Sequence, residues 1–274
     1  SMGGTMRIFV TLGVGYILLV VLISALYEKK YPRAILPLTL ACVFMMTGGW
    51  FVLIEELFPT GDNWRAASLF VSGIMAIHWG VLFAKYQRTV FALMALFFIY
   101  GFLHVGLDML GVSYTYIAII LGSSLWLVGS ALDETPQRAL AEPALLIGTI
   151  WLNGGLFDLI ASSIDTNWAS FIIGICLMLT AYGLHSKDRY PRLIALGYLV
   201  GSMMLYAGLF DLVNNTPVEL IFLAVTAALL YVSVLLHSKA LLLTTVLAML
   251  SYIGYFSAEH FADSLGWPIT LVLM

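Results

Sequence analysis

The chain has 274 residues, of which 62% are hydrophobic and only 10% are charged, and its mean hydropathy is +1.01. About a quarter of the residues of a soluble domain are charged, so this composition excludes a soluble globular protein. The formal net charge of −3 says little about partners, but no predicted loop exceeds about a dozen residues, which excludes a soluble domain and a nucleic-acid-binding surface. The sequence therefore predicts an integral membrane protein.

The apolar runs predict that helices cross the membrane. Each run is about 20 residues long, which matches a hydrocarbon core of roughly 30 Å at a rise of 1.5 Å per helical residue. The runs lack the alternation of polar and apolar residues that is typical of membrane β-strands. We expect an all-α polytopic membrane protein with about 11 transmembrane helices.

The chain is expected to begin with a leading helix over residues 6–28, after a segment, residues 1–5, that is typical of an expression-tag scar. Five tandem helical hairpins follow, of which the last is incomplete. Their helices are predicted at residues 34–57 and 66–84, 89–110 and 113–132, 143–160 and 168–184, 193–213 and 218–236, and 240–258, with a final helix that opens at Pro268.

A recurring acidic residue indicates that the hairpins are repeats. The sequence Gly-Leu-Phe-Asp occurs twice, ending at Asp158 and at Asp211, and Glu56, Asp108 and Asp263 occupy matching places. The interval is about 52 residues, which is typical of a tandem array of two-helix units. We expect one transmembrane domain over residues 1–274, with repeats at 29–88, 89–138, 139–188, 189–239 and 240–274.

The basic residues predict the orientation of the chain. All Lys and Arg residues except Arg7 and Arg65 fall on one side of the predicted helices. Because short cytoplasmic loops are rich in Lys and Arg, we expect the N-terminus outside and the basic loops in the cytoplasm. The bacterial inner membrane is the simplest location for such a chain.

The recurring carboxylates and nearby histidines are candidate site residues. All lie at the predicted outer ends of helices, where they either cap turns or converge into an acidic vestibule that concentrates cations or basic ligands. The predicted outer cluster comprises Glu56, His104, Asp108, Asp158, Asp211, Glu259, His260 and Asp263.

Metal binding is not expected in this cluster. His104 and Asp108 are four residues apart on one predicted helix face, but the chain has no HxxxH pair and no CxxC motif. Cys42 and Cys176 lie in apolar runs, so both are expected to be buried and unpaired. No cofactor is expected.

Three further polar residues lie within predicted membrane helices. His78, Asn153 and Tyr255 either line a polar pathway or form hydrogen bonds between helices. A pathway would place them around a cavity that water can enter, whereas packing would leave them in a dry core.

These features favour a carrier or permease for a small solute or a lipid. A non-catalytic membrane scaffold or sensor is one alternative. A lipid-modifying enzyme that uses His, Asp and Glu at the outer leaflet is another, although a non-enzymatic role is favoured. The expected partners are membrane lipids and other proteins within the membrane, and not nucleic acid.

Overall fold

The computed structural model of the chain describes residues 2–28, 34–58, 63–133, 135, 138–186, 190–214, 216 and 218–261. Every regular element in these ranges is a helix. Among the described residues, nine helices are long and apolar enough to cross a membrane, and a shorter apolar helix covers Ile221–Leu235. The predicted all-α polytopic class is confirmed, while the helix expected at Pro268 lies outside the described residues.

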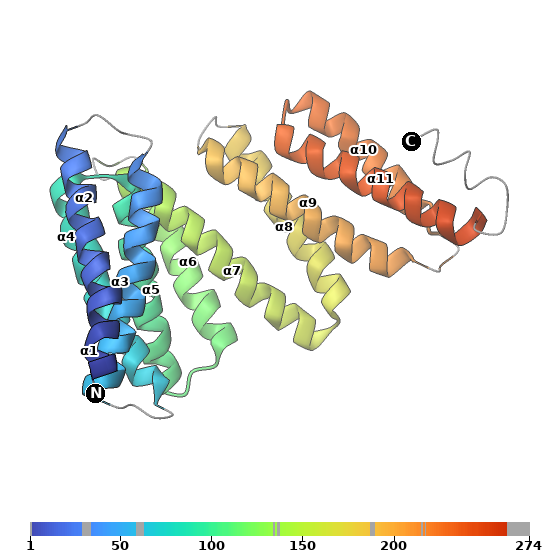
Figure 1. Ribbon diagram of the computed structural model, residues 1–274. Helices are drawn as coiled ribbons and strands as arrows, with labels where there is room; N and C mark the ends of the chain where they lie inside the picture. The colour runs from blue at the N-terminus through green and yellow to red at the C-terminus, as the bar shows by residue number, and fades with distance from the viewer. Residues whose placement is uncertain are drawn as a thin grey trace. The chain divides into compact units, whose positions relative to one another are not determined.

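The chain divides into two compact units, and the boundary falls inside one helix. The first unit, Ser1–Leu152, begins with a continuous span made of a helix, a π-helical turn and a second helix. Its elements are α1 (Met2–Ile8), η1 (Phe9–Gly13), α2 (Val14–Glu28), α3 (Ile35–Leu57), α4 (Trp64–Tyr86), α5 (Thr89–Met109), α6 (Tyr114–Leu132), η3 (Arg138–Leu140) and the first part of α7 (Ala141–Ser163) (Figure 1).

The second unit, Asn153–Met274, contains the rest of α7 and four further helices. These are α8 (Thr166–His185), α9 (Pro191–Val213), α10 (Ile221–Leu235) and α11 (Lys239–Phe261). Asp165 caps α8, because its carboxylate accepts a hydrogen bond of 2.7 Å from the backbone N–H of Asn167. Pro191 occupies the first turn of α9, where its missing N–H is not needed.

A dry aromatic and aliphatic core holds the first unit together. Trp79 of α4 is fully buried and stacks on Phe91 of α5 at 5.9 Å between ring centroids. Cys42 and Met46 of α3 are fully buried in the same core. The prediction that Cys42 is buried is confirmed. The same prediction is wrong for Cys176, which is exposed on α8. A helix within an apolar layer can turn a small apolar side chain toward lipid as readily as toward the core.

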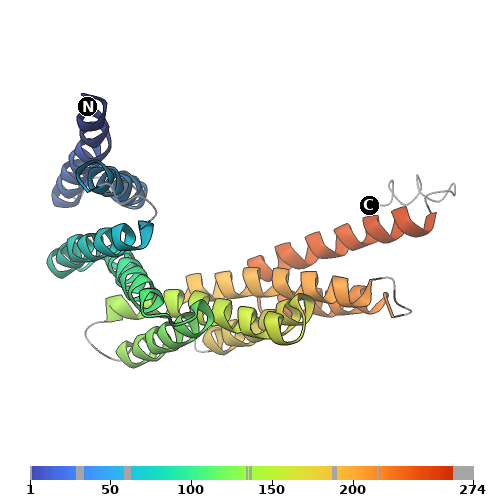
Figure 2. The same ribbon diagram turned by 90° about the horizontal axis from the view of Figure 1, so that it is seen from below.

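Glycine lets α8 and α9 pack with their backbones in contact (Figures 1 and 2). A Cβ atom at Gly174 would stand 2.5 Å from the backbone nitrogen of Leu205, and one at Gly208 would stand 2.5 Å from that of Phe171. Small residues at membrane-helix crossings allow this close approach. The crossing of α6 and α7 is built in the same way, since a Cβ at Gly148 would lie 2.7 Å from the nitrogen of Trp126.

The closest helix pairs are those that meet at the predicted cytoplasmic loops. They are α2 with α3, α4 with α5, α6 with α7, α8 with α9, and α10 with α11. The predicted repeat units join their two helices on the opposite side of the membrane. The first of these close pairs therefore combines the leading helix with the first repeat, and each of the other four combines helices from two neighbouring repeats. The division into repeats itself stays a prediction.

Buried hydroxyl groups join α9 to α11 inside the second unit. Ser202 and Thr244 lie 2.7 Å apart, and the hydroxyl of Tyr206 lies 2.6 Å from that of Thr245. All four side chains are buried. Hydrogen bonds between membrane helices contribute about 0.6 kcal/mol each on average, so these pairs fix the register of two helices more than they add stability.

Candidate functional site

A polar stripe runs along α5. Tyr100, His104 and Asp108 are spaced four residues apart, so they lie one above another on one face of the helix. Just beyond α5, Gly111 adopts a φ of +83°, a conformation that glycine reaches without steric cost. This turn lets the chain reverse into α6, whose first residue, Tyr114, contacts the stripe.

The stripe is the centre of a histidine-aromatic cluster, which comprises Tyr100, His104, Tyr114 and Trp151. The ring of Tyr100 stacks on Trp151 of α7 at 4.4 Å between centroids. His104 lies 5.2 Å from Tyr114 and 5.9 Å from Trp151, again between ring centroids. Three helices of the first unit therefore meet around His104.

Two buried polar atoms in this cluster have no hydrogen-bond partner in the described part of the chain. They are the hydroxyl oxygen of Tyr100 and Nδ1 of His104. Tyr100 is only 3% exposed. Other buried side-chain atoms of the described residues, such as Nε1 of the core residue Trp79, are also without a partner, so these two atoms do not by themselves mark a binding site.

Asp108, the last residue of the stripe, forms an ion pair with Arg65. Nε of Arg65, in the first turn of α4, lies 3.2 Å from a carboxylate oxygen of Asp108. Both side chains are partly exposed, so the pair contributes about 0 to 1 kcal/mol to stability. The contact places the beginning of α4 beside the end of α5, which shows that the two helices are antiparallel.

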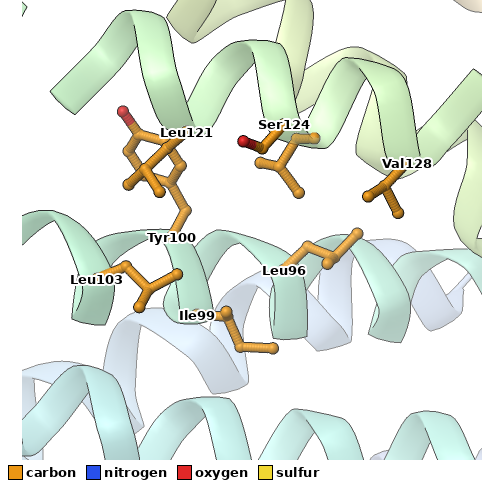
Figure 3. Close-up of a pocket in the computed structure, with 8 residues that line it drawn as sticks. Leu96, Ile99, Tyr100, Leu103, Leu121, Ser124 and Val128 are labelled. Atoms are coloured by element: carbon orange, nitrogen blue, oxygen red, sulfur yellow. The ribbon is translucent and has the colours of Figure 1, made fainter. Parts of the chain in front are cut away.

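A pocket of about 130 Å³ lies between α5 and α6, directly beside the cluster (Figure 3). The ring of Tyr100 extends from α5 toward α6 at one end of the pocket. Apart from Tyr100, the only polar lining side chain is Ser124, whose hydroxyl donates to the carbonyl of Ile120 at 2.7 Å. The remaining lining residues are apolar: Leu96, Ile99, Leu103, Leu121, Leu125 and Val128.

Two of the residues predicted to line a polar pathway make hydrogen bonds between or within helices. Nδ1 of His78 donates to the carbonyl of Ile74 at 3.0 Å, which leaves Nε2 of the neutral ring to accept from the hydroxyl of Tyr16 at 3.1 Å. Tyr255 donates to the side-chain oxygen of Asn214 at 2.8 Å. Asn153 is half-buried in α7, in the second unit.

The residues of the predicted outer cluster are distributed over both units. His104 and Asp108 are neighbours on α5, and the carboxyl group of Glu56 lies against the backbone of Gly4. The side chain of His260 and all of Asp263 lie outside the described residues. Asp158, Asp211 and Glu259 are exposed residues of the second unit. Convergence of the whole set stays a prediction.

No group of three or more His, Cys, Asp or Glu side chains within the described ranges could hold a metal ion. The histidine-aromatic cluster instead supplies hydrogen bonds and flat ring surfaces. Of its members, sequence reasoning singled out His104 alone. Tyr100 could have been found as the residue one turn before His104, whereas Trp151 is brought there only by tertiary packing.

Comparisons of the chain with family models, with curated proteins and with solved structures found no match.

Proposed function

We propose that this multi-pass membrane protein is a carrier for an amphiphile dissolved in the membrane, a lipid rather than a water-soluble solute. The pocket between α5 and α6 carries this proposal. Its lining is almost entirely apolar, so it suits a hydrocarbon chain, which needs no polar partners.

The pocket is open toward the surface on which lipid would lie. Ile99, Leu103 and Val128 line it and are also 42% to 51% exposed. In a chain of apolar helices, exposed aliphatic side chains of this kind face the hydrocarbon layer. An amphiphile can therefore enter from the side, without passing through water.

The polar stripe supports the same function, because it places polar side chains beyond one end of the apolar pocket. The lining residues of α5 lie between Leu96 and Leu103, and Asp108 follows about 7.5 Å farther along the helix, at 1.5 Å per residue. A chain in the pocket can thus place a polar end near His104 and the ion pair of Arg65 with Asp108. In the predicted topology this end lies at the outer surface of a bacterial inner membrane.

Filling the pocket is expected to stop transport. We expect Leu121→Trp to slow the movement of a fluorescent (NBD-labelled) lipid between the leaflets of reconstituted vesicles by about tenfold, the equivalent of about 1.4 kcal/mol of lost binding. The reason is that Leu121 lines the pocket, and the larger indole would occupy it. Dithionite quenching of the label measures the movement.

The matched control is Leu127→Trp. Leu127 lies on the same helix and is 63% exposed, but it does not line the pocket. This variant should transport at the rate of the unchanged protein. Lipid movement that does not depend on the protein, or that is slowed equally by both substitutions, would contradict the carrier function.

A further inference from the structure

A groove lies between the leading helix and α3, at the predicted outer end of the first unit. Its lining residues are Gly3, Met6 and Arg7 of α1, Val10 and Thr11 of η1, and Val52 of α3. The groove has a volume of about 410 Å³, within the range of roughly 300 to 1,000 Å³ that is typical of ligand sites. All of its lining residues except Gly3 follow the segment, residues 1–5, that is expected to be a tag scar.

Direct backbone contact between η1 and α3 fixes the width of the groove. A Cβ atom at Gly49 of α3 would stand 2.6 Å from the Cα of Leu12, so the two backbones touch there. Gly49 is one helical turn before Val52, and Leu12 is next to the lining residue Thr11. The contact falls in a π-helical turn, a rare conformation that is often found at functional sites.

The surface of the groove suits a hydrocarbon chain. The lining is apolar almost throughout, and the side chains of Met6 and Val10 are 70% and 52% exposed. Exposed aliphatic side chains of membrane helices face the hydrocarbon layer. The hydroxyl of Thr11 donates to the carbonyl of Arg7 at 2.8 Å, so it is already satisfied within the helix.

Arg7 places a positive charge at the edge of this apolar surface. Because the lining is apolar, Arg7 contributes its aliphatic stem to the groove, and its guanidinium group lies beyond. Within the described ranges the Arg7 side chain has no ion-pair partner, whereas Arg65, the other basic residue of the predicted outer side, is paired with Asp108. Glu56, one turn after Val52, lies against the backbone of Gly4 instead.

We propose that this groove binds a phospholipid with a net negative charge, whose phosphate pairs with Arg7 and whose acyl chain lies along Met6, Val10 and Val52. A guanidinium group matches the geometry of a phosphate, with which it forms two parallel hydrogen bonds. A zwitterionic lipid would bring a second cation beside Arg7, and a free phosphate ion would leave the apolar surface uncovered. The inference does not rest on the carrier function, because the carrier pocket is lined by α5 and α6.

The test of the head group is Arg7→Gln. Native mass spectrometry of the detergent-solubilised protein measures binding of dioleoylphosphatidylglycerol and of dioleoylphosphatidylcholine, which have the same acyl chains, at equal mole fractions. We expect the unchanged protein to prefer phosphatidylglycerol. Arg7→Gln should weaken phosphatidylglycerol binding roughly fivefold, since one basic side chain near an anionic lipid surface contributes about 1 kcal/mol. Arg7→Lys keeps the charge and should keep the preference.

The test of the acyl chain is Val52→Trp. The indole would occupy the groove, so phosphatidylglycerol binding should fall at least as far as in Arg7→Gln. The matched control is Val81→Trp, because Val81 of α4 is 62% exposed and does not line the groove. If Arg7→Gln weakens binding but Val52→Trp does not, Arg7 attracts anions without an acyl-chain site, and the inference is wrong.

Thermal unfolding separates a lipid-binding role of Arg7 from a structural one. Without added lipid, Arg7→Gln should unfold at the temperature of the unchanged protein, because the exposed Arg7 side chain has no partner to lose. Phosphatidylglycerol should raise that temperature more in the unchanged protein than in Arg7→Gln. A clear fall without lipid would overturn the inference, and so would equal binding of the two lipids by the unchanged protein.

Discussion

Replacing Gly174 with leucine is expected to destabilise the second unit by about 3 kcal/mol. A Cβ atom at this position would stand 2.5 Å from the backbone nitrogen of Leu205 and 2.8 Å from the carbonyl oxygen of Gly201. Both neighbours are backbone atoms of α9, so no side chain can rotate away, and α8 must move off α9. Thermal unfolding in detergent, followed by circular dichroism, measures the loss.

Gly183→Leu is the control for this prediction. Gly183 lies on the same helix, but nothing stands within 4 Å of a Cβ placed there. Leucine favours a helix over glycine by up to about 1 kcal/mol, so this variant should be as stable as the unchanged protein or more stable. Equal losses at the two glycines would show that α8 and α9 do not cross at Gly174.

Replacing Trp79 with alanine is expected to cost about 4 kcal/mol of stability in the first unit. Trp79 is fully buried, and its ring stacks on Phe91. Alanine would leave a cavity between α4 and α5, and the helices can close such a cavity only in part. The free energy of unfolding, measured by titration with SDS in mixed micelles, reports the change.

The matched substitution is Trp64→Ala on the same helix. Trp64 is 60% exposed at the first residue of α4, so its removal should cost less than about 1 kcal/mol. If both tryptophan variants were equally stable, Trp79 would not lie in the core described above.

The helices could be predicted from sequence because the signals that end them are local. The helix predicted at residues 193–213 is observed as Pro191–Val213, and that predicted at 89–110 is observed as Thr89–Met109. The largest error at a helix start is in the leading helix, predicted from residue 6 and observed from Met2, and the next largest is in α10, predicted from residue 218 and observed from Ile221. Residues 218–220 are apolar enough for a helix but form a loop turn before α10, and hydropathy does not distinguish these two structures.

The site could be predicted only in part. The spacing of His104 and Asp108 placed both on one helix face, and the count of basic residues singled out Arg65. The ion pair between Arg65 and Asp108 and the stacking of Trp151 on Tyr100 depend on how α4, α5 and α7 pack. Periodicity along a single helix carries no information about which neighbour it meets, so these contacts required the structure.

Photo-crosslinking tests the central claim, that lipid occupies the pocket between α5 and α6, most directly. A diazirine-bearing lipid would be irradiated with the reconstituted protein, and the labelled residues would be identified by mass spectrometry. We expect the label to concentrate on residues 96–103 and 121–128, and to fall there in the Leu121→Trp variant but not in Leu127→Trp. A label spread evenly over the exposed aliphatic residues of all helices, and unaffected by Leu121→Trp, would contradict the claim.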